Sequence, residues 1–218
     1  MPRWCATASS TPVPDTALPD PLPLFPLGTV LFPGALLSLR IFEARYLDLM
    51  SRCLRDKTPF GVICIRQGTE VGRDRIDCEA VGTLATLDEV DAEQPGILKV
   101  RCTGGRRFRT RGALRQLDDG LWVAAADLVP DDPARMPGPA MLQTVQALAG
   151  AIKALAAQGR VPFAEPYRLD DAGWVANRWC ELLPVSLAAK QKLMELDDPV
   201  IRLSLVDGFL RDKKVVVG

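Results

Sequence analysis

Alternating apolar and polar positions mark the chain from about residue 29 to residue 129 as mainly β-structure. Leu37, Leu39 and Ile41 alternate with Ser38 and Arg40, which is the period of two expected of a half-buried strand. Similar patterns predict further strands over residues 60–65, 81–87, 98–103, 106–117 and 121–129. The first half of the chain is therefore predicted to fold around a sheet.

Glycine-containing motifs and one helical pattern divide this region. Gly104 and Gly105 are predicted to end the strand over residues 98–103. The tripeptide at residues 118–120, Asp-Asp-Gly, predicts a hairpin between the last two strands, because Asp-Gly suits tight turns. An apolar face at helical spacing predicts one helix over residues 42–55, inserted among the strands.

The pattern changes after residues 131–139, which hold three prolines and one glycine and predict a domain boundary. Beyond it the apolar spacing is helical. Helices are predicted over residues 141–156, 174–183 and 187–196, with a fourth beginning at Pro199. Gly159 is expected to end the first of them, and Ser186 and Asp198 to cap the last two.

Strands first and helices second predict the α+β class, because regular strand–helix alternation is missing. We expect a β domain over residues 21–130 and a helical bundle over residues 138–212. Residues 1–20 are predicted to form a flexible N-terminal arm, because prolines lie there among small polar residues.

Composition narrows the classes of function. Lys plus Arg and Asp plus Glu both number 27, so no global field holds the chain on nucleic acid or an anionic membrane. The chain has no histidine, which removes the commonest general base and metal ligand. We therefore expect no metal and no cofactor.

Membrane and redox features point the same way. No apolar run approaches the ~20 residues of a membrane span, so no membrane is expected. The six cysteines are scattered without a C-x-x-C pair or a secretory signal, which is typical of reduced thiols in a cytoplasmic protein.

Several motifs, taken in order, resemble one family. Residues 22–34 (LPLFPLGTVLFPG) resemble the opening of the N-terminal domain of Lon proteases. Residues 42–46 (FEARY), 81–83 (VGT) and 105–109 (GRRFR) follow in that family's order, and residues 182–196 resemble its helical end. The resemblance runs from about Pro21 to Leu210.

The resemblance implies a PUA-like β pseudo-barrel with one inserted helix, followed by a C-terminal helical bundle. It also implies recognition of protein substrates by a stand-alone domain that acts as a non-catalytic adaptor or holding factor. No G-x-x-x-x-G-K-[ST] phosphate loop occurs in the sequence, so no ATPase is expected. The expected partners are unfolded or flexible polypeptide and a separate ATPase or protease; the oligomeric state stays open.

Two motifs supply candidate residues for binding a peptide. The candidates are Phe42, Glu43, Arg45, Tyr46, Arg107 and Phe108. Aromatic surface beside a carboxylate and a guanidinium can grip a polypeptide. In the alternative, favoured interpretation of the first motif, Phe42 and Tyr46 pack on the barrel one turn apart, and Glu43 favours the helix N-terminus.

The arginines around residues 106–111 offer a second function, an RNA-binding PUA-like module. Arg107, Arg109 and Arg111 would share one strand face, but Phe108 would point to the opposite face and could not stack between them. Acidic residues at 88, 89, 91 and 93 are expected to neutralise this stripe. A solvated strand face is the favoured interpretation.

Two further features suggest chemistry or a ligand surface. Ser186 and Lys190 could touch on a helix, as in a Ser–Lys acyl-transfer pair, but a cap followed by a surface lysine explains them better. Trp174 and Trp179 point about 140° apart on a helix, so we expect that they do not share one core. One of them could line a groove between the helices and the strands.

Overall fold

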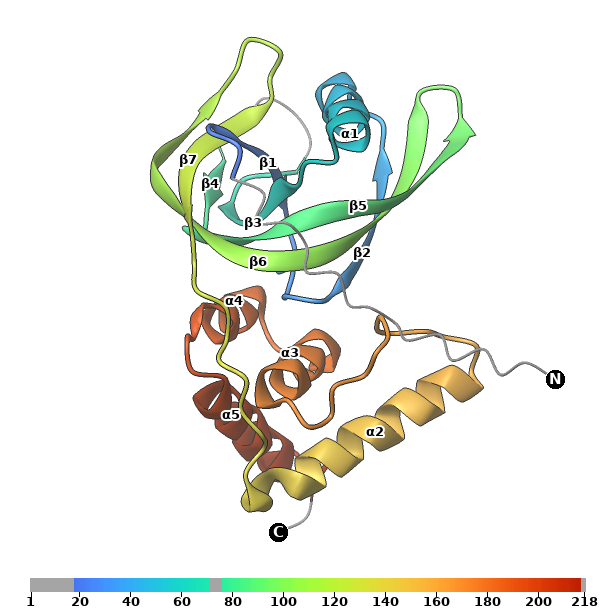
Figure 1. Cartoon of the computed structure of the whole chain (residues 1–218), viewed down its shortest axis with the longest axis vertical. Helices are drawn as coiled ribbons and strands as arrows, with labels where there is room; N and C mark the ends of the chain where they lie inside the picture. Colours follow the sequence, from blue (N-terminus) through green and yellow to red (C-terminus); the bar gives the residue numbers. More distant parts are fainter. Residues whose placement is uncertain (1–17, 71–75, 217–218) are drawn as a thin grey trace, which may run out of the picture.

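The computed structural model describes residues 18–70 and 76–216, and it divides into a strand half and a helix half (Figure 1). Strands with one helix among them make the first half, and helices alone make the second. The α+β class predicted from the sequence is confirmed.

A seven-stranded, mainly antiparallel sheet forms the first half. The strands and their inserted helix are β1 (Leu22–Leu27), β2 (Leu36–Ile41), α1 (Ala44–Asp56), β3 (Phe60–Gln67), β4 (Asp77–Cys78), β5 (Val81–Gln94), β6 (Ile97–Gln116) and β7 (Trp122–Leu128). The order is β1-β7-β6-β5-β3-β4, and parallel pairing of β1 with β3 closes five of these strands into a ring. β2 lies outside that ring and pairs with β6.

The prediction that Gly104 and Gly105 end a strand is wrong, because β6 runs through them for 20 residues. A Cβ atom on Gly104 would lie 2.4 Å from the carbonyl oxygen of Phe32. Glycine is therefore needed here so that the β1–β2 loop can approach the strand, not to break it. The predicted hairpin does form: Gly120, with φ +85°, lies in the turn between β6 and β7.

The helix half begins with a short 3-10 turn, η1, which leads into the first long helix. Its elements are η1 (Pro139–Met141), α2 (Leu142–Ala157), α3 (Ala172–Leu182), α4 (Leu187–Glu195) and α5 (Pro199–Asp212). The predicted caps form, because the side chains of Ser186 and Asp198 accept hydrogen bonds from the first turns of α4 and α5. Gly159 follows α2 with φ +72°, the left-handed conformation that glycine favours at a helix end.

One buried apolar cluster continues from the strand half into the helix half. Trp174 and Trp179 both belong to it, each 6% exposed, so the expectation that they do not share one core is wrong. The reason is that α3 is buried on nearly every side, between the strands and the other helices. Residues that point in different directions from a central helix still reach buried surroundings.

The segment Pro139–Ala157 is, by length and composition, apolar enough to cross a membrane, with a mean hydropathy of 1.3. The expectation that no run reaches spanning length is wrong by this criterion. One such helix is weak evidence for a membrane span, because packed helices of soluble proteins meet the same criterion. Here only 17% of the apolar window is buried, and the buried residues of α2 are Thr144, Leu148 and Ile152.

Candidate functional site

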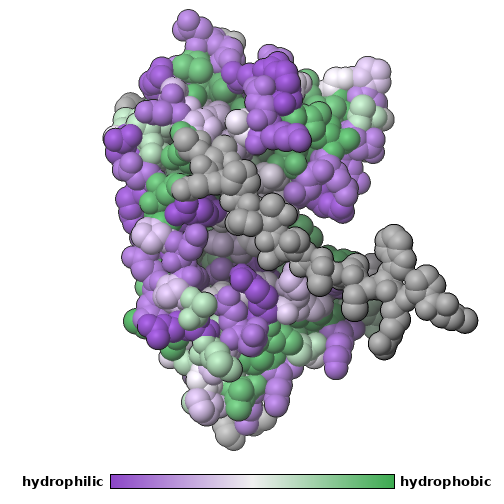
Figure 2. All heavy atoms as spheres, in the orientation of Figure 1, coloured by the Kyte–Doolittle hydropathy of each residue, from purple (hydrophilic) through white to green (hydrophobic). Residues whose placement is uncertain are grey.

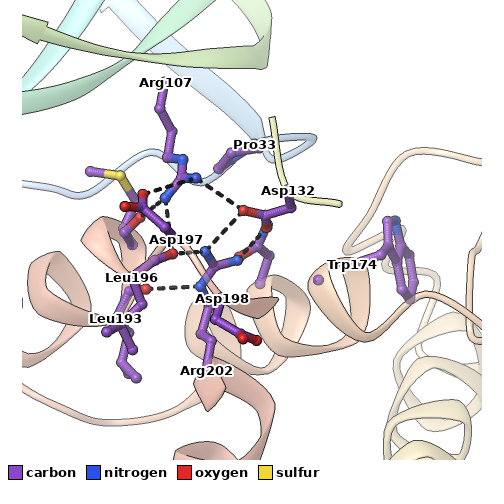
Figure 3. Close-up of polar contacts among 12 residues, drawn as sticks. Pro33, Arg107, Asp132, Trp174, Leu193, Leu196, Asp197, Asp198 and Arg202 are labelled. Atoms are coloured by element: carbon purple, nitrogen blue, oxygen red, sulfur yellow. Dashed lines mark hydrogen bonds and ion pairs between the residues drawn. The ribbon is translucent and has the colours of Figure 1, made fainter. Parts of the chain in front are cut away.

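An arginine network joins the two halves, and Arg107 lies in it. Arg107 from β6 and Arg202 from α5 converge on Asp132 of the connecting segment (Figure 3). Arg107 Nη2 lies 3.0 Å from Asp132 Oδ1, and Arg202 Nη1 lies 2.6 Å from Asp132 Oδ2. Asn177 also accepts a hydrogen bond from Arg202 Nη1 at 3.0 Å.

Arg107 Nη2 also lies 3.7 Å from Asp197 Oδ1, and the other contacts of the guanidinium are to the backbone. Its guanidinium donates to the carbonyl oxygens of Met194 at 2.9 Å, Leu196 at 3.0 Å and Pro130 at 3.3 Å. Burial lowers the pKa of this guanidinium, and Asp132 opposes that shift. With a side chain only 3% exposed, Arg107 holds strands to helices and does not face a surface where a peptide could bind.

A second arginine ties α3 to the β1–β2 loop. Arg178 donates to the carbonyl oxygens of Pro33 and Gly34, both at 2.7 Å, and pairs with Glu181 at 2.6 Å. Burial raises the pKa of Glu181 to about 7, although Arg178 and Lys190 act in the opposite direction. The loop before β2 is therefore fixed from the helix half.

A cavity of about 350 Å³ lies at this seam between the halves. Its lining includes Pro33, Arg107, Asp131, Asp132, Trp174 and Asn177. Trp174 thus lines a groove between helices and strands. Asp131 is 3.3 Å from Arg106, and Asp132 is held by two arginines. Because these charges are already paired, the arrangement suits joining the halves rather than acid–base chemistry.

Phe108 lies in a separate buried cluster inside the strand half and is fully buried. It packs with Leu22, Leu24 and Ile63, and Gly61 makes room for its ring. Phe108 does point away from Arg107, as the strand alternation predicts. It belongs to the core, so the structure does not bring it together with the other candidate residues.

The four candidates at the start of α1 stay together but divide in exposure. Phe42 is 56% exposed, whereas Arg45 and Tyr46 are buried. Arg45 pairs with Glu43 at 2.7 Å and donates to the carbonyl oxygen of Gly120 at 2.9 Å. The Tyr46 ring stacks on Phe25 with ring centroids 4.0 Å apart.

A small cavity of about 210 Å³, here called the β2-edge pocket, adjoins Phe42. It is lined by Phe25, Leu27, Ser38, Leu39, Arg40, Ile41, Phe42, Glu43, Tyr46 and Glu70. The sequence does not indicate that β1 and Glu70 belong to this site. The apolar character of residues 22–27 indicates only burial, and no local pattern shows that the loop after β3 brings Glu70 to the pocket.

Four of the six arginines of β6 form ion pairs, so the arginine-rich strand is not a continuous free basic patch. Arg101 pairs with Glu89, Arg106 with Asp131, Arg107 with Asp132, and Arg111 with Asp127. The expectation that residues 88–93 neutralise the stripe holds for Glu89 alone among these pairs. The other carboxylates come from β7 and the connecting segment, because β7 runs antiparallel beside β6.

The Ser–Lys pair has structural partners. Ser186 Oγ accepts a hydrogen bond from the Ala189 N–H at 3.2 Å, and Lys190 Nζ donates to the carbonyl oxygen of Glu181 at 3.2 Å. Within residues 18–70 and 76–216, no group of three or more acidic, cysteine or histidine side chains could hold a metal ion. On the face drawn in Figure 2, hydrophobic residues lie scattered among hydrophilic ones.

Comparison with known proteins finds one matching family model and similar solved structures. A family model described as the ATP-dependent protease La (LON) substrate-binding domain matches residues 21–212. Among solved structures, a Lon N-terminal domain protein from Xanthomonas campestris is 34% identical, with a TM-score of 0.70 over 86% of this chain and 97% of that one. The N-terminal domain of a Mycobacterium avium complex Lon protease is 18% identical, with a TM-score of 0.61 over 88% and 98% of the two chains. No curated protein sequence matches.

Proposed function

The chain belongs to the substrate-binding domain family of ATP-dependent Lon proteases, and from this membership we propose that it binds unfolded or flexible segments of protein substrates without catalysing a reaction on them. The observation that carries the proposal is the family match over residues 21–212. The domain matched is the part of the protease that binds substrates.

We locate binding at the start of α1, around the β2-edge pocket. Phe42 is a large exposed apolar side chain, and aromatic anchors of this kind dominate the energy of many protein interfaces. Phe25 and Tyr46 wall the pocket beside it with aromatic surface. Arg107 and Phe108 are left out of this site because both are buried elsewhere.

The proposal has two further parts. The chain acts as a holding factor, or as an adaptor for a separate ATPase or protease, by reversible burial of apolar segments. The ring of five strands supports a PUA-like pseudo-barrel for the strand half.

Binding is tested with a permanently unfolded model protein, reduced and carboxymethylated, carrying a fluorescent label whose anisotropy reports the complex. We expect saturable binding without nucleotide. Replacing Phe42 by Ala should weaken it by about fivefold or more, because a central anchor is worth at least ~1 kcal/mol.

Leu54→Ala is the matched control for this experiment. Leu54 is 58% exposed on α1, the helix that begins two residues after Phe42, but does not line the pocket, so binding should stay within twofold. If the wild-type chain does not bind the unfolded protein, the proposed function is wrong. If both variants lose binding equally, the location of the site is wrong.

A further inference from the structure

The second edge of β2 offers a backbone for pairing. All six residues of β2 pair with β6, from Leu36 opposite Thr103 to Ile41 opposite Leu98. Among the described residues no strand pairs with the other side of β2. An open strand edge presents N–H and C=O groups that a second extended chain can satisfy.

The direction of these groups follows from Gly104, which comes directly after the β6 residues, 98–103, that pair with β2. Its N–H donates to the carbonyl of Ala35 at 2.8 Å, and its carbonyl accepts from the N–H of Gly34 at 2.7 Å, so both of its groups face the β2 side. In an antiparallel strand every second residue faces the same neighbour. Cys102 therefore also faces β2, and its partner Leu37 faces β6.

The residue between two inward-facing residues of β2 points outward. Ser38 lies between Leu37 and Leu39, so its N–H and C=O are directed away from β6. These two backbone groups have no hydrogen-bond partner among the described residues. They are available to an added strand.

The β2-edge pocket lies along this same edge. Its lining includes four consecutive residues, 38–41, although successive side chains of a strand point to opposite faces. A cavity that touches all four extends along the strand. Its volume of about 210 Å³ is below the ~300–1,000 Å³ of sites that enclose a whole small ligand, so it suits an apolar side chain.

The charges around the pocket favour an uncharged occupant. Glu43 pairs with Arg45 at 2.7 Å, and Glu70 Oε1 accepts a hydrogen bond from the Gly28 N–H at 2.5 Å. Arg40 also lines the pocket and likewise has a partner within the chain. Among the described lining residues, the charged groups are therefore already engaged, which leaves no free charge for an ionic segment to match.

We propose that the bound polypeptide adds to the free edge of β2 as an extended, uncharged strand and places one apolar side chain in the β2-edge pocket. This inference rests on the proposed function and specifies the class of segment that is bound. Hydrogen bonds to the backbone of Ser38 supply affinity for any sequence, and the pocket supplies the preference for an apolar residue.

The experiment uses the full chain and two labelled decapeptides composed of Leu, Val, Thr and Ser, both with zero net charge. In the second peptide all internal amides are N-methylated, which keeps the side chains and removes the donors from both edges of the strand. We expect the wild-type chain to bind the first peptide at least tenfold more tightly than the second. Affinity should change less than twofold between 50 and 500 mM salt, because no ion pair forms.

Two variants of Ser38 provide a matched pair. Ser38→Pro removes the outward N–H without removing a bond to β6, and should weaken binding of the first peptide at least tenfold. Ser38→Ala keeps the backbone donor and should therefore weaken binding less than Ser38→Pro does. Circular dichroism checks that the proline variant is folded. If it is not folded, the comparison of the methylated with the unmethylated peptide tests strand addition by itself.

The outcomes separate this inference from the proposed function. Equal binding of methylated and unmethylated peptides overturns strand addition and leaves substrate binding in place. Binding of the unfolded protein without binding of the neutral peptide overturns the stated class of segment. Failure of the wild-type chain to bind either probe overturns the proposed function itself.

Discussion

At the seam between the halves, Arg107, Arg178 and Arg202 donate hydrogen bonds to backbone carbonyls, and Arg107 and Arg202 also donate to Asp132. At the edge of β2, by contrast, the backbone groups of Ser38 have no partner among the described residues. Both regions contain residues that look functional in the sequence. Buried polar groups need hydrogen-bond partners inside the protein, whereas the polar groups of an exposed strand edge can bond to water until another chain binds. Satisfaction of hydrogen bonds therefore distinguishes a structural arginine from a binding surface better than residue type does.

The largest expected effect on stability comes from removing Asp132, the carboxylate shared by the arginines at the seam. Asp132→Ala leaves Arg107 and Arg202 buried without their shared carboxylate, and we expect the free energy of unfolding to fall by about 3–5 kcal/mol. Urea denaturation followed by circular dichroism measures the change. Asp127→Ala is the control, because its pair with Arg111 is exposed and should be worth at most ~1 kcal/mol. Equal effects of the two substitutions would contradict the role given to the seam.

The next prediction separates two phenylalanines that the sequence groups as candidates. Phe108→Ala should lower the free energy of unfolding by about 3–4 kcal/mol, because it opens a cavity in a fully buried cluster. The folded fraction should still bind the unfolded model protein with wild-type affinity. A Phe108 variant that stays fully stable but loses binding would contradict this prediction and show that Phe108 is part of the binding site.

Phe108 and Arg107 show how much of the structure can be predicted from the sequence. Strand periodicity predicts the sheet and the side of β6 on which Phe108 lies. It does not reveal that the helix half covers Arg107, because that depends on contacts with Met194 and Leu196, nearly ninety positions later. Periodicity likewise cannot separate Gly104 as a strand end from Gly104 as a point of close approach.

The candidate site was predictable only in part. The motif at residues 42–46 correctly locates the segment that leads into α1, but its aromatic residues are compatible with either packing or binding. The fold assigns packing to Tyr46 and exposure to Phe42, because Phe25 stacks on only one of them. That no described strand pairs with the second edge of β2 follows from the pairing of whole strands, which no short window of sequence contains.

A smaller effect concerns pH at the seam. Burial raises the pKa of Glu181 to about 7 from its ordinary value of 4.5, so the folded state binds this proton more tightly than the unfolded state. The resulting contribution to stability is fully present below pH ~4.5 and is lost as pH rises through 7. We expect up to about 3 kcal/mol less stability at pH 8 than at pH 5 from this group.

Glu181→Gln should flatten this profile in thermal or urea denaturation between pH 5 and 8. Since the chain has no histidine, no other side chain with an ordinary pKa titrates in the middle of that range. A wild-type profile that rises toward pH 8, or a variant with an unchanged slope, would show that the Arg178 ion pair outweighs burial at Glu181.

The smallest expected effect lies at the free edge, and it sharpens the contrast with the seam. Phe42→Ala and Ser38→Ala should each change the free energy of unfolding by no more than about 0.5 kcal/mol, because exposed side chains contribute little to folding. Binding of the unfolded model protein should nevertheless weaken for the Phe42 variant. Loss of more than ~1 kcal/mol at Phe42 would mean that this residue packs on the barrel, as the alternative interpretation of the motif holds. A change in affinity without a change in stability is the combination that only a binding residue produces, because a side chain that holds the fold cannot be removed without weakening it.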